Sequence, residues 1–138
     1  MGALSWEISK SEGLVVIRGV GVFNLAFMTS FRKAMRAEGA AGYSKLFDLS
    51  RADIQLSSDD LQTMVAQTRL PDPVKSGPIA IILGHEPPPL LVDMAILMKT
   101  RLGNRRRLRL FTDEAEARRW LSTEAEPVSP ARVLRDVG

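Results

Sequence analysis

The sequence predicts a single α/β domain in which a mixed five-stranded sheet is flanked by four helices. Short apolar runs of strand length alternate with longer segments whose apolar residues recur at helical spacing. The first two apolar runs are joined by a short turn, which is typical of a hairpin. The expected order is ββαβαβαβα, and strands connected through helices run parallel to one another. Only the first hairpin is therefore expected to be antiparallel.

The individual strands and helices follow from these patterns in order. Strands are expected at residues 6–9, 14–17, 43–49, 79–83 and 107–111. Helices are expected from Asn24 to Gly39, from Ser57 to Pro71, from Leu90 to Leu102 and from Asp113 beyond Leu121. Glycine accepts the left-handed conformation that follows a helix, and proline cannot continue its hydrogen bonds, so both residues mark helix ends. The glycine-rich segment 19–21 is expected to be a plain break before the first helix.

The length and the amino-acid composition of the chain limit the classes of protein to which it can belong. The 138 residues suffice for one domain, expected at residues 1–124, with a loosely ordered tail at 125–138. The chain has no cysteine, which excludes a disulfide framework, a thiolate zinc site and a cysteine nucleophile. No charged segment precedes an apolar stretch at the start, and no apolar run approaches the ~20 residues that cross a bilayer. A cytoplasmic location is expected.

Polar residues that could form a site are expected at the carboxyl ends of the parallel strands, where ligands of open α/β sheets bind. Asp48 and Ser50 follow the third strand, and the only histidine, His85, follows the fourth. A catalytic interpretation would pair His85 with Asp48 and use Ser50, Ser57 or Ser58 as the nucleophile. No G-x-S-x-G turn presents any of these serines. We therefore expect these five residues to form a ligand-binding or regulatory site and not the active site of an enzyme.

The sequence supports metal or nucleotide binding less than it supports a polar site at the carboxyl ends of the strands. One histidine and no cysteine leave Asp48, His85 and Glu86 as the set that could hold a metal ion. The glycines at 19 and 21 precede a helix but lack the third glycine of a dinucleotide-binding loop. No metal and no cofactor are expected.

Basic residues are concentrated between Asp93 and Asp113, a window without any acidic residue. Its cations are Lys99, Arg101, Arg105, Arg106, Arg107 and Arg109. Such a run is usually a solvated rim around a turn and a strand edge, and the alternative is an anion patch at 105–107. No recognised DNA- or RNA-binding motif accompanies these residues, so nucleic acid is not an expected partner.

The predicted third helix is apolar on nearly all of its sides. An outer helix of a small domain normally buries one stripe, so the remaining apolar residues need another surface to cover them. Leu90, Ile96 and Leu97 are the candidates for that contact. A second copy of the chain, giving a homodimer, is the simplest partner. A membrane surface, an apolar ligand and the chain's own tail are the alternatives.

Four features of the sequence resemble the SpoIIAA-like group of STAS domains, in particular the small stand-alone bacterial proteins labelled STAS/SEC14-like. They are the glycine-rich break at 19–21, the strand ending in Phe-Asp-Leu-Ser at 47–50, the apolar strand at 79–83 and the closing segment at 109–121. The resemblance implies a SpoIIAA-like fold and a non-enzymatic regulatory module that acts through protein contacts. The alternative that it implies is a carrier or sensor of a small apolar or anionic, lipid-like ligand near the third helix.

The resemblance also singles out Ser57. Anti-sigma-factor antagonists of this superfamily are phosphorylated on a serine at the start of the second helix, after the aspartate that ends the preceding strand. Ser57 stands at the matching distance from Asp48, but Leu56 replaces the aspartate of that motif and Asp59 replaces its glycine. Asp60, three residues after Ser57, completes the spacing of a capping box. Ser57 is therefore interpreted first as a helix cap and second as a phosphorylation site.

Overall fold

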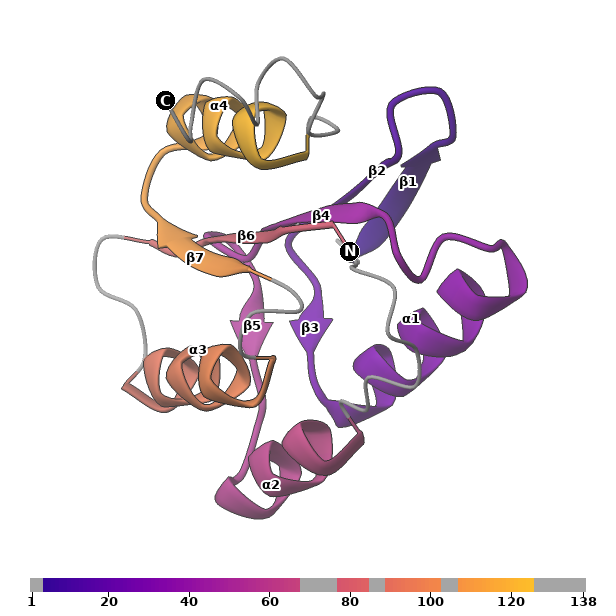
Figure 1. Ribbon diagram of the computed structural model, residues 1–138. Coiled ribbons are helices and arrows are strands. Elements are labelled where there is room, and N and C mark those ends of the chain that lie inside the picture. Colours follow the sequence, from indigo (N-terminus) through magenta and orange to yellow (C-terminus); the bar gives the residue numbers. More distant parts are fainter. Residues whose placement is uncertain (1–3, 68–76, 85–88, 103–106, 126–138) are drawn as a thin grey trace.

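The computed structural model describes residues 4–67, 77–84, 89–102 and 107–125 of the chain. Its main sheet has five strands in the order β1-β2-β4-β6-β7 (Figure 1). They are β1 (Ser5–Ser9), β2 (Leu14–Arg18), β4 (Ser44–Asp48), β6 (Ile79–Ile82) and β7 (Leu108–Phe111). β1 pairs antiparallel with β2 and each later pair is parallel, as the sequence predicts.

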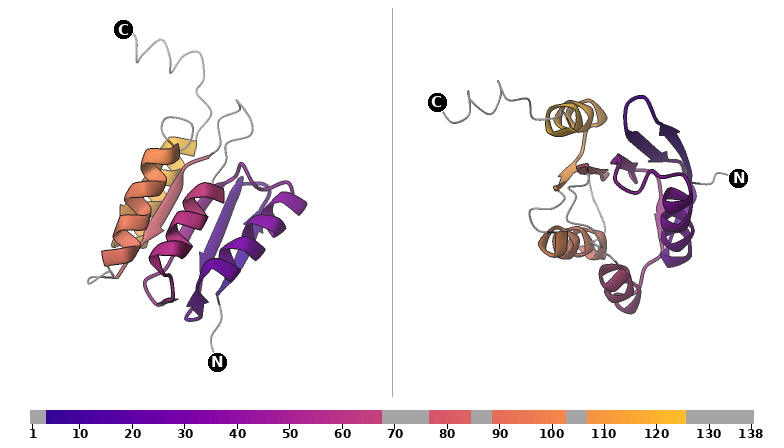
Figure 2. Two further views of the ribbon diagram at one scale, coloured as in Figure 1. Left: turned by 90° about the horizontal axis from the view of Figure 1, so that it is seen from below. Right: turned by 45° about the vertical axis from the view of Figure 1, so that its right-hand side comes forward.

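Four described helices cover the two faces of this sheet unequally. They are α1 (Leu25–Ala37), α2 (Ser58–Gln67), α3 (Pro89–Leu102) and α4 (Glu114–Ala125). The first three lie on one face of the sheet and α4 lies on the other (Figure 1). α3, α2 and α1 form a row with α3 at one end (Figure 2), and α2 packs on its two neighbours in this row. No helix within the described ranges is long and apolar enough to cross a membrane.

Two short strands are an addition to the arrangement that the sequence predicts. β3 (Val22–Phe23) and β5 (Asp53–Ile54) form a separate parallel pair. The Asp53 N–H donates to the Gly21 carbonyl at 3.0 Å, so the segment expected to be a plain break takes part in strand pairing. Strands of two residues are too short to show an alternating pattern in a sequence. Phe23 is buried, so the pair also contributes to the core.

The sheet divides the core into two parts, because side chains along a strand alternate between its faces. The larger part lies under α1, α2 and α3. It contains five aromatic rings whose neighbouring centroids are 5.4–6.2 Å apart: Trp6, Phe23, Phe27, Phe31 and Phe47. The smaller part lies under α4 and is formed by Leu46, Ala80, Ile82, Phe111, Ala117 and Leu121. Burial of these apolar side chains is the main favourable contribution to folding.

A buried lysine ties the end of α1 to the sheet. Lys45, in β4, is 5% exposed, and its Nζ atom donates hydrogen bonds to three backbone carbonyl groups. They belong to Ala40 (3.2 Å), Ala41 (2.8 Å) and Tyr43 (3.0 Å). Gly39 has a φ of 71°, the left-handed conformation that ends a helix and redirects the chain. The ammonium group therefore organises the connection between α1 and β4.

Candidate functional site

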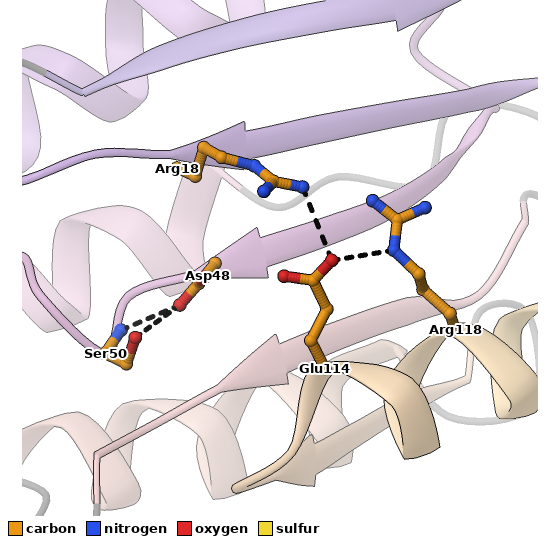
Figure 3. A network of polar contacts seen from close by, with 5 residues as sticks. All are labelled: Arg18, Asp48, Ser50, Glu114 and Arg118. Atoms are coloured by element: carbon orange, nitrogen blue, oxygen red, sulfur yellow. Dashed lines mark hydrogen bonds and ion pairs between the residues drawn. The ribbon is translucent and has the colours of Figure 1, made fainter.

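The carboxyl edge of the main sheet brings together polar residues from distant parts of the sequence. β2, β4, β6 and β7 are parallel, so they all end at this edge. Arg18 ends β2 and Asp48 ends β4, and α4 begins shortly after β7 with Glu114. These three side chains lie near one another (Figure 3), on the face of the sheet that α4 covers.

Asp48 organises the turn that follows β4. Its Oδ1 atom accepts hydrogen bonds from the Ser50 hydroxyl at 2.6 Å and from the Ser50 backbone N–H at 3.2 Å. An aspartate that bonds the backbone two residues ahead forms an Asx-turn. Asp48 is half-buried and Ser50 is exposed. The structure therefore brings these two predicted site residues together, and the geometry of the turn accounts for their contact.

Ser57 forms the reciprocal cap of α2 that the sequence predicts. The Asp60 N–H donates to Ser57 Oγ, and the Ser57 N–H donates to Asp60 Oδ2, both at 3.0 Å. Ser58 is the first residue of the helix and is exposed. Among the described residues, no hydrogen bond joins Ser57 or Ser58 to Asp48. The helix-cap interpretation of Ser57 is confirmed.

An ion-pair network links the end of β2 to α4 (Figure 3). Glu114 Oε2 accepts a hydrogen bond from Arg118 Nε at 2.8 Å and lies 3.5 Å from Arg18 Nη2. All three side chains are more than one-third exposed, so solvent screens the pairs and each adds little stability. Sequence reasoning missed this network. The i, i+4 spacing of Glu114 and Arg118 could have indicated one pair, whereas the contact with Arg18 depends on the strand order.

Several predicted site residues cannot be placed at this edge or elsewhere, because they lie outside the described part of the chain. They are His85, Glu86, Arg105 and Arg106, together with the side chain of Leu90. Arg107, from the predicted anion patch, is described and exposed. The Arg109 guanidinium lies 5.1 Å from the Phe111 ring centroid, on the α4 side of the sheet. In the ranges that are described, no group of three His, Asp or Glu side chains could hold a metal ion.

A half-buried arginine joins two helices of the opposite face. Arg32, on α1, donates a hydrogen bond from Nη2 to the Met64 carbonyl of α2 at 3.2 Å. Burial lowers the pKa of Arg32 below that of a free guanidinium, and the nearby charge of Arg36 lowers it further. A guanidinium stays protonated in proteins, so Arg32 supplies positive charge near the C-terminal end of α2. No basic residue of α2 occupies its own last turn.

The outer face of α3 exposes two neighbouring apolar side chains. Ile96 is 56% exposed and Leu97 is 47% exposed. On the other side of the helix, Ala95 is buried, and Val92 and Met98 pack against the core. One stripe therefore anchors α3, and the contact candidates Ile96 and Leu97 face away from the domain.

Comparisons with known proteins identify the fold. No model of a protein family matches the chain, and no curated protein matches it. Among solved structures, the chain is similar to an uncharacterized protein from the DUF3478 family, with a SpoIIAA-like fold, from Shewanella loihica. The two are 17% identical and superpose with a TM-score of 0.55, over 87% of this chain and 93% of the other. The chain therefore has a SpoIIAA-like α/β fold, in agreement with the resemblance of its sequence.

Proposed function

We propose that the chain is a non-enzymatic binding module with a regulatory role, which acts through protein contact at the outer face of α3. The observation that carries the proposal is the adjacent exposed pair Ile96 and Leu97 on one turn of this helix. Among the described residues, the other exposed large apolar side chains are Val20, which precedes the short strand β3, and Val22, which begins it. α3 is the described helix on which such side chains gather.

Covering this face would stabilise a complex through the hydrophobic effect. Full burial of an Ile or Leu side chain is worth about 1.5–3 kcal/mol. About half of each side chain remains accessible in the single chain. Covering Ile96 and Leu97 together therefore contributes roughly 2 kcal/mol for each molecule that docks.

The polar residues at the carboxyl edge support a binding role more than catalysis. Asp48 accepts from its neighbour Ser50, and Ser57 closes a helix cap, so each of these side chains has a local structural role. A phosphate on Ser57 would gain from the N-terminus of α2, but it would also stand beside the carboxylates of Asp59 and Asp60, which oppose its charge. We therefore assign the regulatory contact to α3 and not to a phosphorylated Ser57.

Light scattering across a concentration series tests the proposal on wild type, on Leu97→Glu and on the control Thr123→Glu. Thr123 is exposed on α4, on the opposite face of the sheet, so the control adds the same charge to a helix away from α3. The proposal predicts the same associated mass for wild type and control. It predicts that Leu97→Glu is a monomer whose circular dichroism spectrum matches that of wild type.

Two results would count against the proposal. Equal masses for all three proteins would show that Leu97 does not mediate contact between copies of the chain. Native mass spectrometry could also reveal a co-purified small apolar molecule that is lost in Leu97→Glu. That second result would favour the carrier of a small ligand over a protein-contact module.

A further inference from the structure

We infer that the C-terminal segment 126–138 docks on the β1–β2 hairpin, on the side of the sheet that α4 covers. We call this the hairpin surface, and it is formed by Glu7 of β1 with Leu14 and Val16 of β2. The inference goes beyond the proposed function and does not depend on it, because α3 lies on the opposite face of the sheet. It identifies an occupant for an apolar surface that the described residues leave half covered.

The hairpin surface lies beside α4 and not under it. α4 packs on β4, β6 and β7, and the β1–β2 hairpin lies to one side of it (Figure 1). Leu14 and Val16 pack against the core under α4, yet both remain half-buried. Glu7 is exposed and pairs directly with Val16, so the two side chains share a face of the sheet. The apolar core therefore continues past the flank of α4 and ends at these partly covered residues.

The place where α4 ends puts the following segment within reach of this surface. α4 begins at the carboxyl edge of the sheet, where Glu114 meets Arg18, and it runs back across the sheet. Ala125 therefore lies toward the amino ends of the strands, where Leu14 begins β2. Residues 126–133 can span roughly 25 Å when extended, whereas neighbouring strands lie only ~4.8 Å apart. The exposed residues of α3 lie across the sheet, so the hairpin surface is the nearer of the two.

The sequence of the segment complements the hairpin surface. Pro127 and Pro130 cannot continue the hydrogen bonds of a helix, which favours an extended chain. In an extended chain, Arg132 and Leu134 point to the same side, because side chains alternate with a period of two. Leu134 then covers the apolar pair of β2 while Arg132 meets Glu7. Within the described part of the chain, Glu7 has no ion-pair partner of its own.

The small size of the surface favours a tethered occupant over a separate one. Leu14 and Val16 are already half-buried, so they offer far less than the ~800 Å² per partner of a standard protein interface. A segment joined to α4 needs less contact, because a short linker holds it near the surface at an effective concentration of about millimolar. The chain's own C-terminal segment therefore fits this surface better than a second copy of the chain.

Paramagnetic broadening of NMR signals in the full chain tests the inference. Ser5 is exposed and pairs with Arg18, so it lies on the α4 side of the hairpin, and Ser5→Cys provides the only thiol of the chain for a nitroxide label. We predict that this label broadens the amide signals of residues 131–138. The same label at Thr100→Cys, an exposed position of α3, is the control and should leave these signals sharp.

Variants of the labelled Ser5→Cys protein test the contacts themselves. Leu134→Glu should abolish the broadening, whereas Ser129→Glu adds the same charge outside the contact and should retain it. Glu7→Arg and Arg132→Glu should each lower the ratio of docked to free segment about threefold. The double variant Glu7→Arg/Arg132→Glu restores the pair with exchanged signs, and its ratio should return close to that of the labelled parent.

Sharp signals of residues 131–138 in the labelled Ser5→Cys protein would overturn the inference. Broadening from the Thr100 label in its place would assign the segment to the outer face of α3. A mixture of labelled unenriched protein and unlabelled isotope-enriched protein separates contacts within one chain from contacts between chains. Broadening of equal strength in this mixture would show that a second copy supplies the segment, which would also contradict the inference. Single charge variants that behave like the labelled parent would refute the pairing of Arg132 with Glu7.

Discussion

Replacing the buried Lys45 with methionine should lower the free energy of unfolding by about 2 kcal/mol. Methionine has a similar length and no charge, so the change removes the ammonium group with little change in packing. Lys45 is 5% exposed and donates to three backbone carbonyl groups. The substitution therefore removes the polar contacts between the end of α1 and β4.

The magnitude follows from what remains at the three carbonyl groups. A hydrogen bond to a charged donor contributes about 1.5–3 kcal/mol. The Ala40 carbonyl still accepts a hydrogen bond from the Tyr43 N–H at 3.0 Å. Ala41 is exposed, so water can replace the lysine at its carbonyl group. The net loss is therefore closer to one such hydrogen bond than to three. The substitution also removes the free-energy cost of burying a charged ammonium group, and this gain offsets part of the loss.

Urea unfolding followed by circular dichroism measures this difference, with Lys33→Met as the matched control. Lys33 lies exposed on α1, so its replacement should change the free energy of unfolding by less than about 0.5 kcal/mol. A Lys45→Met protein as stable as wild type would refute the reasoning. Equal losses in the two variants would refute it as well, because burial would then make no difference.

Two further substitutions test the local geometry. Ser57→Ala removes the acceptor of the Asp60 N–H and should lower the free energy of unfolding in urea by about 1 kcal/mol, whereas Ser58→Ala should leave it nearly unchanged. Gly77→Ala places a methyl group 2.6 Å from the Ser44 backbone nitrogen. The two segments must then move apart, at a cost of about 1–3 kcal/mol. A wild-type melting temperature for Gly77→Ala would contradict that close approach.

The main sheet and the helix starts could be predicted from the sequence because their signals are local. Asn24 accepts the Phe27 N–H at 2.8 Å, and Ser57 forms a reciprocal cap, as their positions before amphipathic segments indicate. The continuous apolar run at 79–83 is buried throughout and forms a strand between two parallel neighbours. Such a run is what a strand covered on both faces requires.

The remaining features depend on contacts between distant segments. β3 and β5 adopt strand geometry because they pair with each other, and neither carries a pattern of its own. Arg18 and Glu114 meet only through the strand order. The sequence indicates that the third helix is apolar on nearly all sides, but packing decides that Ala95 is buried while Ile96 is exposed.

The most direct test of the contact at α3 is disulfide formation between two copies of an Ile96→Cys variant. The chain has no cysteine, so the introduced thiol is the only one that can react. In a symmetric dimer that meets through this face of α3, the two Cα atoms at this position should approach the ~4.4–6.8 Å separation that a disulfide needs. We predict a covalent dimer that forms much faster with Ile96→Cys than with Thr123→Cys under the same oxidising conditions. Equal rates at the two positions, or no covalent dimer at either, would contradict a contact between copies at α3.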